Sequence, residues 1–171
     1  MAEMELATLI CGEIAGTLRQ DEHGLCSFAY APTYRGAPLS LTMPLSNRTY
    51  GHNIVRPFLF GLLPDSQEQR RAIATEHDVA SNSPVALLCH IGFDCAGAVQ
   101  FCRADQLDAA RGRVSAYRPL TNSQIAHKLK AIRDDERETW MGSNESWSLG
   151  GNQGKFALAW HDGQWCECLG S

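Results

Sequence analysis

The order of apolar and polar residues predicts a chain that begins with β-strands. In LATLICGEIAGTLR, apolar and polar residues alternate on either side of Gly12-Glu13, which predicts a β-hairpin from Leu6 to Arg19. LCSFAYA predicts a third strand, and LSLTMPL predicts a fourth strand that ends near Pro44. The N-terminal part is therefore expected to be mainly β-structure.

A helical period follows. Asn53 is suited to be an N-cap, and the apolar residues of NIVRPFLFGLL return to one helical face, with Pro57 in the first turn. A second helix is expected in LPDSQEQRRAIATEHD, with Asp65 or Ser66 as its cap. A third is expected in PVALLCHIG, where Gly92 fits a C′ glycine, and CAGAVQFC then returns to a strand.

These patterns divide the chain into three parts. Residues 1–102 are expected to form one α+β unit, a small sheet with helices packed on it. Residues 103–120 show no strong period and are expected to be a linker. Residues 121–171 are expected to hold a helix and a hairpin that turns at Asp162-Gly163.

The expected C-terminal helix has a narrow apolar face. Thr121 or Asn122 can cap it, and Ile125, Leu129 and Ile132 follow at spacings of four and three. This pattern is typical of a surface helix that packs on a small core.

Composition indicates a globular protein without a broad basic surface. The 171 residues are 44% hydrophobic, enough for one or two small cores. A net charge of −4 argues against direct binding to nucleic acid or an anionic membrane, so DNA would be contacted only through a partner. The N-terminus lacks a secretion signal, and no stretch reaches the roughly 18 apolar residues of a membrane span, so a cytoplasmic protein is expected.

The cysteines and histidines indicate no metal centre. The seven cysteines contain no C-x-x-C spacing, and we expect them to be reduced and to serve as small buried side chains. The six histidines are scattered along the chain without metal-ligand spacing.

One stretch, SLGGNQGKFAL, suggests chemistry. Gly150, Gly151 and Gly154 directly precede a predicted strand, where backbone N–H groups can approach an anion closely. Protein kinases carry such a loop between two strands, whereas the spacing fails the Walker pattern. Spacing alone leaves both an ordinary turn and a nucleotide-binding loop open.

The whole chain resembles the N-terminal part of HipA-family proteins. The resemblance rests on FAYAPTYRGAPLSLTMPLSNRTY, FLFGLLPDSQEQRRAIA, LLCHIGFDCAGAVQF and SLGGNQGKFALAWHDGQWC, which occur in the family's order and spacing. It implies the N-terminal segment of a serine/threonine kinase that acts as a toxin and is neutralised by a HipB-like helix-turn-helix antitoxin. It also implies a translation component such as glutamyl-tRNA synthetase as the kinase substrate.

The resemblance assigns roles to the glycine-rich stretch. Ser148 matches the serine that is autophosphorylated, and a phosphate there would add about two negative charges beside a loop meant for ATP phosphates. The residues that match the ATP-phosphate loop are Gly150, Gly151, Asn152, Gln153, Gly154 and Lys155.

The family's catalytic groups have no match in this sequence. Family kinases continue after the hairpin with an ATP-contacting lysine, a catalytic Asp and a magnesium-binding Asp, whereas this sequence ends at Gly170-Ser171. ATP and magnesium are therefore expected in the complete family kinase, and the chain alone is expected to be inactive. An engineered fragment, a proteolytic remnant and a natural truncated or split protein all remain open. The alternative function is a non-catalytic module that docks on a separate kinase core or on a HipB-like antitoxin.

Overall fold

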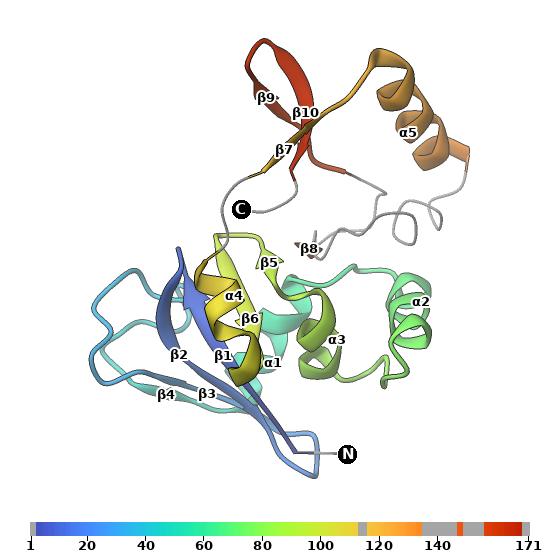
Figure 1. Ribbon diagram of the computed structural model, residues 1–171. Helices are drawn as coiled ribbons and strands as arrows, with labels where there is room; N and C mark the ends of the chain where they lie inside the picture. Colours follow the sequence, from blue (N-terminus) through green and yellow to red (C-terminus); the bar gives the residue numbers. More distant parts are fainter. Residues whose placement is uncertain (1–2, 113–115, 135–146, 149–155, 169–171) are drawn as a thin grey trace. The chain divides into compact units, whose positions relative to one another are not determined.

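The structure describes most of the chain. The computed structural model describes residues 3–112, 116–134, 147–148 and 156–168 (Figure 1). These residues form both helices and sheets, so the predicted α+β class is confirmed.

The chain divides into two compact units. One comprises residues 1–111 and 146–151, and the other comprises residues 112–145 and 152–171. The first unit contains β1 (Met4–Ile10), β2 (Glu13–Gln20), β3 (Cys26–Tyr30), β4 (Thr49–Tyr50), α1 (His52–Gly61), α2 (Gln67–Glu76), α3 (Pro84–Ile91), β5 (Asp94–Cys95), β6 (Val99–Cys102), the 3-10 turn η1 (Ala104–Gln106), α4 (Leu107–Arg111) and β8 (Trp147–Ser148). The second contains β7 (Tyr117–Pro119), α5 (Asn122–Asp134), β9 (Ala159–His161) and β10 (Gln164–Cys168).

A seven-stranded sheet organises the first unit, in the order β4-β3-β2-β1-β6-β5-β8. The neighbouring strands are antiparallel except for β5 and β8, which are parallel. β1 and β2 form the predicted hairpin, joined at Cys11 and Gly12, which both have positive φ. The prediction of an N-terminal hairpin is therefore confirmed.

Apolar side chains cover both faces of this sheet. Successive residues of a strand point to opposite faces, so Leu6 and Ile10 lie on one face and Leu9 on the other. The first face carries the main core, which also includes Val55 of α1 and Leu88 of α3. On the second face Leu9 packs in a smaller cluster with Cys102 and with Ala110 of α4. Figure 1 shows α1 and α3 on the opposite side of the sheet from α4.

The predicted fourth strand is wrong. Residues 39–45 form only one isolated bridge, between Ser40 and Met43, and the strand that pairs with β3 is β4. The hydroxyl of Tyr30 accepts a bond from the Leu39 amide at 2.6 Å and donates one to the Met43 carbonyl at 2.7 Å. A buried side chain thus satisfies backbone groups that a strand would have paired, and the alternating pattern could not reveal it.

The start of α1 also differs from the prediction. The helix begins at His52 after Gly51, whose carbonyl accepts bonds from the Ile54 and Val55 amides, so Asn53 is not the N-cap. Pro57 consequently lies in the second turn and cannot donate to the Asn53 carbonyl. Pro57 and Asn53 are both exposed, so water can reach the Asn53 carbonyl that lacks its helical bond.

The next two helices begin as predicted, each with a serine cap. Ser66 accepts a bond from the Gln69 amide, and Ser83 accepts one from the Ala86 amide at 3.1 Å. Ser83 also donates to the buried side chain of Gln20 at 2.7 Å, which ties α3 to β2. The cap at Ser66 and the helix beginning at Pro84 are confirmed.

Gly92 ends α3 for a reason other than the one expected. Its φ is −85°, so it is not in the left-handed conformation of a C′ glycine. A Cβ atom there would lie 2.3 Å from the Leu88 carbonyl oxygen and 3.1 Å from Cβ of Phe101. Close packing, rather than a positive φ, accounts for the glycine.

Residues 103–120, expected to be a linker, contain secondary structure. η1 and α4 follow β6 directly, and Gln100 of β6 donates to the Ala110 carbonyl at 3.3 Å. β7 then pairs with β10 in the second unit. The helix was not apparent because α4 is only five residues long and buries only Ala110.

The second unit contains a three-stranded antiparallel sheet in the order β7-β10-β9, together with α5. β9 and β10 form the predicted hairpin, which turns through Asp162 and Gly163, both with positive φ. Thr121 caps α5, as expected. The apolar stripe of α5 is only partly buried, because Leu129 is 55% exposed.

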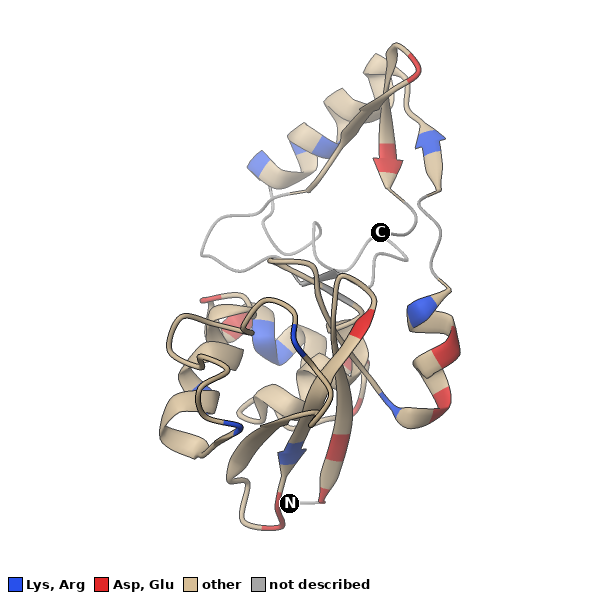
Figure 2. Cartoon of the chain, turned by 90° about the vertical axis from the view of Figure 1, so that its left-hand side faces the viewer, with Lys and Arg blue, Asp and Glu red and all other residues tan. Residues whose placement is uncertain are grey.

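Charged residues of both signs occur in the first unit. Figure 2 shows acidic and basic residues interspersed over the part of the first unit that the structure describes. Across the described ranges, every helix is too short or too polar to cross a membrane.

Candidate functional site

The glycine-rich stretch lies mostly outside the described residues. Of the residues that the sequence assigned, only Ser148 is described, and it is the last residue of β8. The six positions that fall outside the described residues are Gly150, Gly151, Asn152, Gln153, Gly154 and Lys155. The nearest described residues are those that precede the stretch, the upstream flank, and those that follow it, the downstream flank.

The upstream flank joins the large sheet of the first unit. Trp147 pairs with Asp94, and Ser148 pairs with Cys95, in a parallel register. Cys95 is buried and also pairs with Val99 of β6. The backbone at Ser148 is thus held at the edge of a packed sheet immediately before the glycine-rich stretch.

The downstream flank leads into the β9–β10 hairpin. Phe156 is the first described residue after the stretch, and it is partly buried. The hairpin follows, with Trp160 opposite Trp165 and the two rings edge to face at a centroid distance of 5.0 Å. Described strands thus stand on both sides of the stretch in the sequence, β8 before it and β9 after it.

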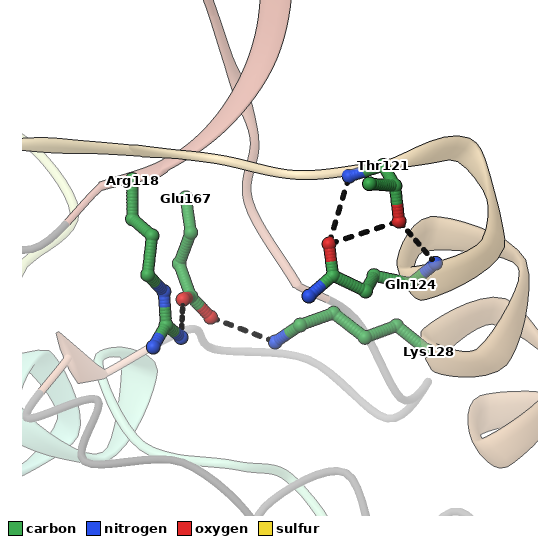
Figure 3. A network of polar contacts seen from close by, with 5 residues as sticks. All are labelled: Arg118, Thr121, Gln124, Lys128 and Glu167. Carbon is green, nitrogen blue, oxygen red and sulfur yellow. Dashed lines mark hydrogen bonds and ion pairs between the residues drawn. The ribbon is translucent and has the colours of Figure 1, made fainter.

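A buried carboxylate connects this hairpin to its neighbours. Glu167 of β10 is only 1% exposed, and its carboxylate binds Arg118 of β7 and Lys128 of α5. The Lys128 ammonium lies 2.8 Å from Oε1 of Glu167. Figure 3 shows the three side chains converging from three different elements. The Glu167 carboxylate thus lies between two cations that come from neighbouring elements.

A capping box begins α5, the helix that carries Lys128. The Thr121 hydroxyl accepts a bond from the Gln124 amide at 3.2 Å, and the Gln124 side chain accepts one from the Thr121 amide at 2.8 Å (Figure 3). This reciprocal pair is a capping box, which fixes the first turn. Lys128 lies one turn further on, and its ammonium is 5.7 Å from the ring centroid of Phe156.

Sequence reasoning missed this cluster. Arg118 lies in the expected linker, Lys128 is one of several charges on a helix, and Glu167 is one carboxylate in the strand WCECL. A lone acidic residue in an otherwise apolar strand is the only local signal. Its partners become evident only when the three elements pack together.

A second polar cluster lies in the first unit, between α2 and α3. The rings of His77 and His90 stack at a centroid distance of 4.5 Å, and Arg103 donates to the Cys89 sulfur at 3.0 Å. Burial lowers the pKa of His90, and the nearby His77 and Arg103 lower it further. The sequence had suggested scattered histidines, so this pairing is a product of the fold.

The described residues provide no metal centre. Within them, no three His, Cys, Asp or Glu side chains gather as a set that could hold an ion. All seven cysteines are described, and all are free thiols. Five of them are buried, which confirms their expected role as small core side chains: Cys26, Cys89, Cys95, Cys102 and Cys166.

Comparison with known proteins finds similar curated proteins, two of which are described here. A putative kinase, Y4mE, of Sinorhizobium fredii is 32% identical over 160 residues, which cover 90% of this chain and 37% of that protein. An uncharacterized protein of Haemophilus influenzae is 30% identical over 89 residues, which cover 52% of this chain and 82% of that protein. The chain thus spans little more than a third of Y4mE.

A solved structure shares the fold. It comes from the complex of the Shewanella oneidensis MR-1 toxin–antitoxin proteins HipA and HipB with operator DNA. The match has a TM-score of 0.66 and 24% identity, and it covers 96% of this chain and 38% of the solved chain. The family model of the HipA N-terminal domain matches residues 6–102, which is more than half of the chain. This chain therefore belongs to the HipA N-terminal domain family.

Proposed function

We propose that this chain is the N-terminal segment of a HipA-type serine/threonine kinase, a cytoplasmic toxin that phosphorylates a translation component such as glutamyl-tRNA synthetase. The observation that carries the proposal is the extent of the likeness to the putative kinase Y4mE. That likeness covers 90% of the chain and so continues well past residue 102, where the domain match ends. The segment after residue 102 thus resembles part of a putative kinase, in addition to the N-terminal domain.

The composition of the glycine-rich stretch supports the proposal that it binds ATP phosphates. It follows β8 and precedes the β9–β10 hairpin, and glycines allow backbone N–H groups to approach phosphate oxygens closely. In this proposal residues 150–155 close over the ATP phosphates. Bound ATP supplies the phosphoryl group, and magnesium neutralises the charge that develops during its transfer.

These 171 residues alone are proposed to transfer no phosphate. Transfer needs metal, a base and positioning groups together, and a glycine-rich loop supplies little of that stabilisation.

Ser148 is the proposed site of autophosphorylation. Its backbone is paired with Cys95 directly before the stretch. A phosphate there would place about two negative charges next to the ATP phosphates. Repulsion between these groups is expected to weaken ATP binding and switch the kinase off.

The test uses the native polypeptide that carries this sequence, purified from its source cells and incubated with radiolabelled ATP and magnesium. We expect label at Ser148, which Ser148→Ala abolishes and the neighbouring control Ser146→Ala retains. The 171-residue chain incubated alone should incorporate none. Label-free native protein, or label that persists in Ser148→Ala, would contradict the proposal.

A second candidate function is a non-catalytic module that docks on a HipB-like antitoxin or on a separate kinase core and inhibits it. The Haemophilus influenzae relative favours it, because the match covers 82% of that protein, so this unit makes up most of a protein there. The solved relative comes from a complex with HipB and operator DNA, and here DNA would be reached only through the antitoxin. A stable one-to-one complex that inhibits the kinase would favour this function.

A further inference from the structure

The connection between β3 and β4 carries arginines but no carboxylates. Residues 31–48 include Arg35 and Arg48, and they contain no Asp or Glu. The run without an acidic residue is longer still, from residue 23 to residue 64, and it includes Arg56 as a third arginine. This segment of the first unit is therefore basic, although the chain as a whole has a net charge of −4.

The two arginines of this connection bind one backbone oxygen. Nη1 of Arg35 donates to the Tyr34 carbonyl at 2.8 Å and to the Pro32 carbonyl at 2.7 Å. Nη1 of Arg48 donates to the same Tyr34 carbonyl at 3.1 Å. The other N–H groups of both guanidinium groups bind no acceptor within the part of the chain that the structure describes. Two like charges therefore lie close together with donors to spare.

The backbone that carries these arginines is held in place. The Arg48 carbonyl accepts a bond from the Tyr30 amide at 2.8 Å, which ties it to β3. The side chain of Tyr34 is buried and donates to the Ala37 carbonyl at 2.8 Å. Gly36 lies against the same side chain, since a Cβ atom there would be 2.5 Å from the Tyr34 hydroxyl. A ligand of the two guanidinium groups would therefore have little backbone to order.

Holding the Tyr34 carbonyl does not by itself explain both arginines. One donor satisfies this carbonyl, and the second brings a like charge that repels the first. Burial raises the pKa of Tyr34 and the Glu13 carboxylate raises it further, so Glu13 lies near Tyr34. Across the described ranges, however, Glu13 forms no ion pair with Arg35 or Arg48. An anion from outside the chain that binds both guanidinium groups would relieve their repulsion.

We propose that the β3–β4 connection is a docking surface for an acidic segment of a partner protein, and that Arg35 and Arg48 bind the carboxylates of that segment. A guanidinium group donates two parallel hydrogen bonds to a carboxylate, so this pair matches two neighbouring Asp or Glu side chains. A nucleic acid fits less well, because its binding uses an extended basic surface and a chain with a net charge of −4 repels a long polyanion. The proposal is independent of the proposed kinase function, because it uses no residue of the glycine-rich stretch.

The test measures the binding of a fluorescein-labelled glutamate hexapeptide to the 171-residue chain by fluorescence anisotropy, with a glutamine hexapeptide as the neutral probe. We expect the glutamate peptide to bind and the glutamine peptide not to bind. The double variant Arg35→Gln/Arg48→Gln should weaken binding about tenfold. The matched control Arg71→Gln/Arg111→Gln removes the same charge from two exposed arginines of the first unit and should change the affinity little.

A lysine pair separates the shape of the guanidinium group from its charge. Arg35→Lys/Arg48→Lys keeps both charges but loses the planar fork, so binding should weaken only about threefold. Amide NMR signals of the unaltered chain locate the peptide without any variant, and they keep the test valid if a double variant fails to fold. Titration with the glutamate peptide should shift the signals of Tyr34, Arg35 and Gly36.

Four results would overturn the proposal. The first is equal affinity for the glutamate and glutamine peptides, or no binding of either. The second is an equal loss of binding in the Arg35/Arg48 pair and in its control pair, which would indicate attraction by overall charge alone. The third is a set of shifted signals outside residues 31–50. The fourth is binding of a short DNA duplex, lost in Arg35→Gln/Arg48→Gln, by a chain that does not bind the glutamate peptide, which would assign the surface to phosphates.

Discussion

Gly16 of β2 lies in close contact with the neighbouring strand β3. A Cβ atom at this position would lie 2.2 Å from the Ala29 carbonyl oxygen and 2.8 Å from the Phe28 ring. The neighbouring backbone belongs to β3, which is paired on its other side with β4. The sheet can therefore relieve the overlap only by distorting a strand that is fixed on both sides.

Replacing Gly16 with alanine should destabilise the first unit by about 1–3 kcal/mol, the usual cost of forcing extra atoms into a packed core. The matched control is Gly61→Ala at the end of α1, where a Cβ atom meets nothing within 4 Å. Alanine there should stabilise the unit by about 0.5–1 kcal/mol, because glycine is a poor helix former. Denaturant unfolding of both variants measures this, and a Gly16→Ala variant as stable as Gly61→Ala would disprove the steric argument.

Ser83 and Ser66 are both helix N-caps, but they make different numbers of hydrogen bonds. Both cap a helix, whereas Ser83 also donates to Gln20, whose side chain is 2% exposed. Loss of the cap alone costs about 1 kcal/mol. Loss of the bond to a buried amide adds about 1–3 kcal/mol, because the Gln20 oxygen is left without its partner.

We therefore expect Ser83→Ala to cost about 2–4 kcal/mol in the free energy of unfolding and Ser66→Ala about 1 kcal/mol. Thermal and denaturant unfolding of the two variants give the comparison directly. Equal costs would mean that the bond between Ser83 and Gln20 contributes nothing beyond the cap.

At the scale of elements, the contact between α2 and α3 should respond to pH. The pKa of His90 is below its ordinary value of 6.5 because of burial, His77 and Arg103, so the unfolded chain binds a proton there more readily than the folded chain. The contribution of His90 to the free energy of unfolding is therefore fully present at a pH above the pKa that His90 has in the unfolded chain. It is lost as the pH falls through and below 6.5.

The first unit should accordingly melt at a lower temperature at about pH 5 than at about pH 8, and His90→Phe should reduce this difference because phenylalanine cannot take up a proton. The control is His23→Gln in an exposed turn, where the side chain is 76% exposed. Thermal melting across the pH range measures the effect. An equal pH dependence in the parent protein and in His90→Phe would exclude His90 as its source.

The elements that the sequence predicted correctly are those specified by neighbouring residues. The β1–β2 hairpin follows from alternation around Gly12, and α2 begins at Ser66 because a serine hydroxyl there reaches an amide three residues away. The predicted fourth strand was wrong because the side chain of Tyr30, from the preceding strand β3, binds the backbone groups of Leu39 and Met43. The alternation of apolar and polar residues indicates which side chains are buried. It does not indicate which group forms hydrogen bonds with the backbone.

The candidate site was predictable only in part, for the same reason. The glycines and the lysine of residues 150–155 are close together in the sequence and can be recognised from it alone. The roles assigned to these residues stay predictions, because they lie outside the described residues. The cluster of Arg118, Lys128 and Glu167 joins three elements. Its members share no local pattern, so only the fold brings them together.

At the scale of the whole molecule, both units draw on separated parts of the chain. Residues 146–151 belong to the first unit although they follow residues 112–145 of the second, and within them β8 pairs with β5. Ser148 and Phe156 therefore belong to different units, with the glycine-rich stretch between them.

The central place of β1 in the sheet has a consequence for synthesis on the ribosome. β1, β2 and β3 emerge first and can pair with one another as a meander. The other edge of β1 pairs with β6 at residues 99–102, which are translated much later. Until then the nascent chain presents an unpaired apolar edge, the kind of edge that invites association with other chains. Ribosome-bound chains that stop before β6 should therefore be good clients for chaperones, and longer ones should not.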